Sequence, residues 1–135
     1  MISYVDTNIL LDVFADYQVF ANQSQALLDR AYEDGLLIIC GLVYAELAPR
    51  FESKAKLDLA LRAAHIEIEE PGLDVAYLAG KKWAEYRSSG GTRGRVLPDF
   101  IIGAHALLRA DCLLTRDRGF YATYFSELRI LAAGG

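Results

Sequence analysis

Short apolar segments with strand character alternate with helical segments along almost the whole chain. The strand segments are 2–5, 36–40, 66–69, 112–115 and 128–131, and helical spacing or composition marks 22–34, 42–51, 54–64, 73–88 and 98–110 between them. Such alternation predicts right-handed crossovers and an α/β fold, with a central parallel sheet of about five strands covered by helices on both faces. With 135 residues, 53% of them hydrophobic, the chain suffices for one continuous core, so we expect a single domain spanning 1–135.

Four acidic residues fall where such a sheet would bring them together. Asp6 follows the first strand segment and Asp117 follows the segment 112–115, whereas Glu46 and Asp99 lie in helical segments. The carboxyl ends of neighbouring parallel strands border the crevice in which open α/β sheets bind ligands. Because four carboxylates in one cleft repel one another unless they share protons or a divalent cation, we predict a Mg²⁺ site suited to phosphodiester chemistry. One metal ion or two would fit this pattern.

Each acid taken alone also has an ordinary structural explanation. An Asp at a strand end is common as a turn residue or helix cap, and Asp99 in a first helical turn complements the helix dipole. Glu46 has Arg50 one turn later as a possible ion-pair partner, and Pro49 should end or kink the helix that carries it. The joint pattern of four acids favours the metal site over these separate explanations.

The helix that begins near Pro98 has small residues on one face. Gly103 and Ala106 lie four and seven positions after Asp99, where an amphipathic helix would place large aliphatic side chains. We therefore expect this face to stay open for a cation, water and phosphate.

Charge and composition exclude several other classes of protein. With 18 acidic and 14 basic residues, the formal charge of −4 argues against nucleic-acid binding through bulk positive charge. Phosphates would have to be held locally, and a solvated basic surface is the alternative role for the candidates Arg87, Arg93, Arg95, Arg116 and Arg118. Cys40 and Cys112 lie in apolar strand segments and are predicted to be buried free thiols. No apolar stretch reaches the roughly 18 residues that span a bilayer, so we expect a soluble, cytoplasmic protein without a membrane partner.

The motifs that contain the four acids resemble those of the PIN domain family, in particular the VapC-type ribonuclease toxins of bacterial toxin–antitoxin pairs. These motifs are DTNIL (6–10), YAEL (44–47), PDFIIGAHA (98–106) and LTRDRGF (114–120). The resemblance covers nearly the whole chain and implies a PIN-like nuclease domain, a hydrolase that cleaves RNA with Mg²⁺ or Mn²⁺. It further implies a cognate antitoxin that blocks the groove and a homodimer. By the same resemblance, Asn8 orients the first acid and Thr115 supports the last.

Two other functions fit parts of the sequence. A non-catalytic module on the same scaffold would hold RNA or protein through the basic segment that contains Arg93 and Arg95. A phosphatase of the haloacid-dehalogenase type also begins with a strand that ends in Asp. That chemistry needs a second Asp two residues after the first, where this chain has Asn8. The binding module is therefore the one alternative to the nuclease that we retain.

Overall fold

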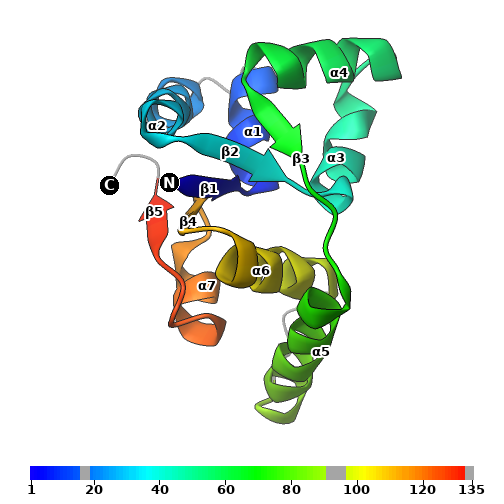
Figure 1. Cartoon of the computed structure of the whole chain (residues 1–135), viewed down its shortest axis with the longest axis vertical. Helices are drawn as coiled ribbons and strands as arrows, with labels where there is room; N and C mark the ends of the chain where they lie inside the picture. The colour runs from blue at the N-terminus through cyan, green and yellow to red at the C-terminus, as the bar shows by residue number, and fades with distance from the viewer. Residues whose placement is uncertain (16–18, 91–96, 133–135) are drawn as a thin grey trace.

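A parallel five-stranded sheet lies at the centre of the computed structural model, which describes residues 1–15, 19–90 and 97–132 (Figure 1). The strands are β1 (Ile2–Val5), β2 (Leu36–Ile39), β3 (Ile66–Ile68), β4 (Cys112–Thr115) and β5 (Ile130–Ala132). Their order across the sheet is β3-β2-β1-β4-β5, and each neighbouring pair is parallel. The sequence-based prediction of this α/β fold is confirmed, and the structure places β1 beside β4.

Helices cover both faces of the sheet, and α1 to α4 lie on the opposite side from α5 to α7 (Figure 1). Their bounds are α1 (Thr7–Phe14), α2 (Ala21–Asp34), α3 (Gly41–Leu47), α4 (Lys54–Ala63), α5 (Leu73–Ser88), α6 (Leu97–Arg109) and α7 (Arg118–Tyr124), with a short 3-10 helix, η1 (Ala48–Arg50), after α3. This sandwich of three layers follows from the direction of the crossovers, which reverses after β3.

Two helix ends form where the sequence predicted them. α2 stops before Gly35, whose φ of +148° suits only glycine, and a Cβ there would collide with the backbone of Met1. α3 ends at Leu47, and the chain tightens into η1 around Pro49 because proline cannot donate the next helical hydrogen bond. Gly35 therefore determines where the chain leaves α2 to enter β2, and Pro49 determines where α3 ends.

α7 is a helix that the alternating pattern did not reveal. It has only seven residues, and three of them are aromatic, which are weak helix formers. Its stability comes from an aromatic cluster with α6 and the segment that follows α7. The ring contacts of this cluster join Phe100, Phe120, Tyr121, Tyr124 and Phe125.

The small face of α6 does not stay open, so that expectation was wrong. Gly103 and Ala106 are both buried, and a Cβ built on Gly103 would lie 2.5 Å from Cε2 of Phe125. Gly103 is therefore small because the ring of Phe125 packs against it, and this face of α6 is not what leaves space for a cation.

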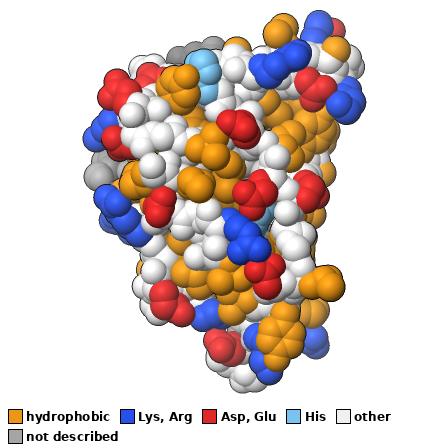
Figure 2. All heavy atoms as spheres, viewed as in Figure 1, with side chains coloured by type: hydrophobic (Ala, Val, Ile, Leu, Met, Phe, Trp, Pro, Cys, Tyr) orange, Lys and Arg blue, Asp and Glu red, His pale blue; other side chains and the backbone are white. Residues whose placement is uncertain are grey.

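Cys40 and Cys112 are buried free thiols, as predicted. In the part of the chain that the structure describes, no helix is long and apolar enough to cross a membrane. Hydrophobic side chains are exposed over α5, at the lower end of the molecule in Figure 2. On that helix Leu73 is 88% and Tyr77 is 71% exposed.

Candidate active site

A pocket of about 230 Å³ opens where β1 and β4 end, and all four acids of the predicted site line it. Asp6 directly follows β1, and Asp117 directly precedes α7, two residues after β4. Asp99 lies in the first turn of α6 and Glu46 near the end of α3. The other lining residues are Thr7, Asn8, Leu11 and Tyr121. Because β1 and β4 are neighbours, the two strand-end acids reach one pocket from adjacent strands.

Asp6 is the most buried of the four acids, with 7% of its surface exposed. Its backbone N–H donates to the carbonyl of Leu114, which continues the β1–β4 pairing into the loop. Its carboxylate accepts hydrogen bonds from the Thr7 amide (2.8 Å), the Thr115 hydroxyl (2.7 Å) and the Asn8 side-chain amide (3.2 Å). These donors fix the carboxylate in one orientation at the floor of the pocket.

Burial raises the pKa of Asp6 to about 6, from an ordinary value of 3.8. The hydrogen bonds from Thr115 and Thr7 act in the opposite direction, and the negative charges of Glu46 and Asp117 raise the pKa further. Desolvation and neighbouring charge therefore outweigh the donors.

Thr115 connects the first and last acids through one hydroxyl group. Its Oγ1 donates to Asp6 and accepts from the backbone N–H of Asp117 at 2.9 Å. Asn8 adds a second connection, since its side-chain oxygen accepts from the Arg116 amide at 3.1 Å. The loops after β1 and β4 are thus held to each other directly beneath the pocket.

Glu46 reaches the pocket through a contact between helices. Its Oε1 accepts a hydrogen bond of 2.6 Å from the hydroxyl of Thr7, in the first turn of α1. Thr7 therefore serves two acids, Asp6 through its amide and Glu46 through its hydroxyl. The sequence reasoning missed Thr7, although its place between Asp6 and Asn8 was a usable signal.

The carboxylates share the walls of the pocket without forming a compact ligand set. Within residues 1–15, 19–90 and 97–132, no group of three or more His, Cys, Asp or Glu side chains has the spacing of a metal-binding cluster. Mutual repulsion and the separate hydrogen bonds of Asp6 and Glu46 account for the spread. Hard divalent cations prefer oxygen donors of this kind and keep several waters, so the residues fit Mg²⁺ or Mn²⁺ bound partly through water.

Arg116 is paired with a carboxylate of the protein itself, and its predicted contact with phosphate stays a prediction. Its guanidinium donates to both carboxylate oxygens of Asp12, from Nε at 2.8 Å and from a terminal nitrogen at 3.0 Å. The same group lies over the ring of Phe20, 4.2 Å from its centroid. Asp12 is buried and also accepts from the Ser24 hydroxyl at 2.7 Å. An acid inside the apolar run of α1 was the signal for this pair in the sequence.

Two of the other predicted basic residues, Arg87 and Arg118, are absent from the described lining of the acidic pocket. Arg87 lies over the ring of Trp83 at 5.0 Å, near the end of α5. Arg118 lines a different pocket, beside β5. Arg93 and Arg95 lie outside the described residues, so their predicted role stays a prediction.

The fold and the site together define a class: a doubly wound parallel α/β domain with an acidic pocket where its central strands end. The chain belongs to the PIN domain family, whose family model matches residues 3–126. Members of this family are nucleases. Three of the four motif acids, Asp6, Glu46 and Asp117, are also the groups whose charges interact in the pocket.

Solved structures with a similar fold include two VapBC complexes and one toxin–antitoxin complex. VapBC2 from Rickettsia felis, bound to a DNA fragment from its promoter, is 20% identical over 98% of each chain with a TM-score of 0.73. VapBC-1 from nontypeable Haemophilus influenzae is 21% identical over 98% of each chain with a TM-score of 0.70. The toxin–antitoxin complex from Klebsiella pneumoniae is 25% identical over 89% of this chain and 90% of its own, with a TM-score of 0.64. No protein of curated function matches the sequence.

Proposed function

We propose that this protein is a Mg²⁺- or Mn²⁺-dependent endoribonuclease and the toxin of a toxin–antitoxin pair. The observation that carries the proposal is the pocket in which Asp6, Glu46, Asp99 and Asp117 share one set of walls. Membership of a nuclease family supports the reaction class, and the likeness to VapBC complexes supports a cognate antitoxin as partner. A homodimer and a cytoplasmic location belong to the same proposal.

The residues of the pocket divide the work between them. A bound divalent cation would lower the pKa of a water for attack on phosphorus and neutralise the leaving oxygen. Asp6 and Asp99 are the strongest ligand candidates, with Glu46 and Asp117 holding the cation directly or through water. Thr115 and Asn8 orient Asp6, and the Thr7 hydroxyl turns Glu46 toward the pocket.

Cleavage of RNA by purified protein tests the proposal. Structured RNA such as a transfer RNA, incubated with MgCl₂ or MnCl₂, should be cut, and Asp6→Asn or Asp99→Asn should lower the rate by about 100-fold or more, since each removes a charged metal ligand. Asp29→Asn, the same change on the exposed surface of α2, is the matched control and should retain activity. RNA left intact with both metals, or Asp6→Asn cutting as well as the parent, would refute the nuclease.

Metal binding separates the nuclease from a non-catalytic binding module. Mn²⁺ should raise the melting temperature of the parent protein, because a cation bound only by the folded state stabilises it. The rise should be smaller in Asp6→Asn and Asp99→Asn and unchanged in Asp29→Asn. A melting temperature of the parent protein that does not change with Mn²⁺ would favour the non-catalytic binding module.

A further inference from the structure

We propose that the outer edge of β5 binds an extended acidic peptide segment of a partner protein as an added strand. β5 is an outer strand of the sheet, and β4 occupies its inner edge. Figure 1 shows β5 at the side of the sheet, between α2 and α7. An outer strand presents a row of backbone donors and acceptors that another extended segment can pair with. The proposal goes beyond the nuclease and does not require it.

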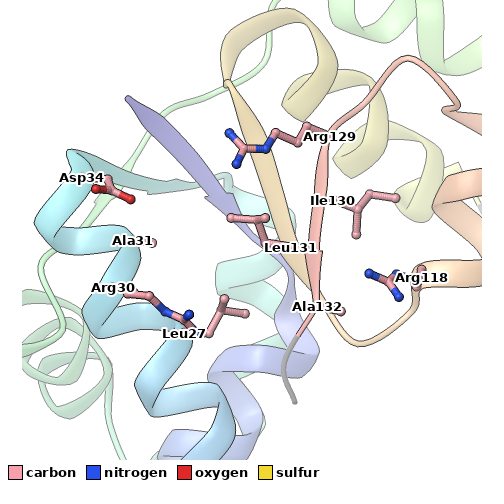
Figure 3. A pocket seen from close by; sticks show the side chains of 9 residues that line it. All are labelled: Leu27, Arg30, Ala31, Asp34, Arg118, Arg129, Ile130, Leu131 and Ala132. Carbon is pink, nitrogen blue, oxygen red and sulfur yellow. The ribbon is translucent and has the colours of Figure 1, made fainter. Parts of the chain in front are cut away.

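A pocket of about 280 Å³ lies beside this edge and takes its lining from α2, β5 and the start of α7 (Figure 3). Leu27 and Ala31 contribute apolar surface from α2. On β5, Leu131 and Ile130 extend to opposite sides of the strand (Figure 3). Because side chains of a strand alternate between two faces, a segment added here would meet apolar surface on both.

Three arginines surround this pocket: Arg30 on α2, Arg118 at the start of α7, and Arg129 just before β5. Asp34 is the one acid in the lining. Considering the described parts of the chain, none of the three guanidinium groups forms a salt bridge. In a protein with a net charge of −4, this local positive charge selects carboxylates.

The outer edge of β5, the apolar lining of the pocket and the three arginines together favour a peptide over a second copy of the chain or a nucleic acid. A second copy of this chain would bring its own three arginines against these, and like charges at an interface are strongly unfavourable. A nucleic acid would satisfy the arginines, but it has no use for the free backbone edge of a strand or for Leu27 and Leu131. An acidic segment with alternating apolar residues satisfies all three features.

Fluorescence anisotropy with a labelled peptide of alternating Glu and Val tests the proposal. Such a peptide can shift by one residue to present Glu to either face, so it should bind the full-length protein, whereas the same peptide with Lys for Glu should not. Blocking alternate amides of the peptide by N-methylation should abolish binding, because the added strand then loses its hydrogen bonds. Peptide binding should also slow hydrogen exchange of the β5 amides.

Charge reversal on the protein locates the binding site. Arg118→Glu and Arg129→Glu should each weaken peptide binding by about tenfold or more, as expected for loss of a charge pair. Arg62→Glu, on the exposed surface of α4, is the matched control and should bind as the parent does. No binding up to about 1 mM peptide, the weak end of measurable affinity, would overturn the proposal. The proposal would also be overturned if neither charge reversal changed the affinity for the peptide. Displacement of the peptide by single-stranded RNA would indicate a nucleic-acid site instead, and a self-association altered by Arg118→Glu would indicate a second copy of the chain.

Discussion

Opposing effects act on the carboxylate of Asp6. Three donors favour its charged form, whereas burial and two nearby carboxylates favour the protonated form, and the pKa of about 6 shows that burial prevails. A carboxylate in this state costs the folded protein stability at neutral pH. A divalent cation in the pocket would remove that cost, so the proposed metal ligand Asp6 makes the metal-free protein less stable.

The stability of the metal-free protein should fall as pH rises through the range between 3.8 and about 6. In that range folded Asp6 holds a proton that the unfolded chain has released, so raising the pH favours unfolding. A pKa shift of about two units corresponds to a change of at most about 3 kcal/mol in the free energy of unfolding. Asp6→Asn should flatten this part of the profile and raise the melting temperature at pH 7, measured by denaturation in EDTA. Asp29→Asn is the control, and a parent-like profile for Asp6→Asn would contradict the pKa.

Gly103 offers a second test at the scale of one residue. Gly103→Ala should destabilise the protein by about 1–3 kcal/mol, because the new Cβ would lie 2.5 Å from the Phe125 ring and overpack the core. Gly80→Ala on α5 is the matched control: nothing lies within 4 Å of its Cβ, so it should be neutral or stabilise by up to about 1 kcal/mol. Urea denaturation measures both. Equal effects of the two substitutions would show that Phe125 is not packed against α6 as described.

Among the elements, α1 and the β4–α7 loop are held together by an ion pair whose carboxylate is buried and whose guanidinium group is partly exposed. Asp12 of α1 is 2% exposed and receives two hydrogen bonds from Arg116, the neighbour of Asp117. Asp6 immediately precedes α1, and Asp117 immediately follows Arg116. The ion pair therefore helps to hold Asp6 and Asp117 in fixed positions relative to each other. It therefore supports the pocket from outside.

Breaking one half of this pair should cost more than replacing both halves. Arg116→Met leaves the Asp12 carboxylate buried with Ser24 as its remaining donor. Loss of one partner of a fully buried pair costs about 3–5 kcal/mol, and we expect a smaller loss here because the Arg116 side chain is 31% exposed. Asp12→Leu combined with Arg116→Met should recover part of that loss. Chemical denaturation of the two single variants and the double variant gives the coupling energy. Additive losses would mean that the pair contributes nothing as a unit.

The elements also show what the sequence can and cannot predict. Apolar strand segments, Gly35 and Pro49 are local signals, so the sheet and two helix ends were predicted correctly. α7 depends on distant aromatic partners, and Gly103 is small because Phe125 lies against it, so neither could be read from neighbours in sequence. The pairing of Arg116 with Asp12 was missed for the same reason, since the two residues are 104 positions apart. Three of the motif acids carry a local signal, because Asp6 and Asp117 follow strand ends and Asp99 lies in the first turn of a helix, whereas Glu46 lies near the end of α3.

At the scale of the whole molecule, α5 leaves apolar side chains exposed on its outer face. Leu73 and Tyr77 are exposed one turn apart, and large apolar side chains grouped on a surface often mark an interface. The homodimer of the proposed function would bury this face. The free edge of β5 would then stay available for a different partner.

Leu73→Arg combined with Tyr77→Arg should convert the dimer into a monomer, because two charges cannot be buried in an apolar interface. Light scattering of the parent protein and this variant measures the change in mass. Leu59→Arg on α4, which is 62% exposed, is the control and should leave the dimer intact. A parent protein that is monomeric at every concentration, or a variant that stays dimeric, would contradict the assignment of this face.

The order of the strands in the sheet differs from their order in the chain, and this has a consequence for synthesis. β1 is made first, yet it lies at the centre, and its neighbour β4 begins only at Cys112. A nascent polypeptide on the ribosome therefore carries Asp6 for most of its elongation without the Thr115 hydroxyl or Asp117 to complete its surroundings. If the chain is the proposed nuclease, its acidic pocket can be complete only after the ribosome has made Asp117.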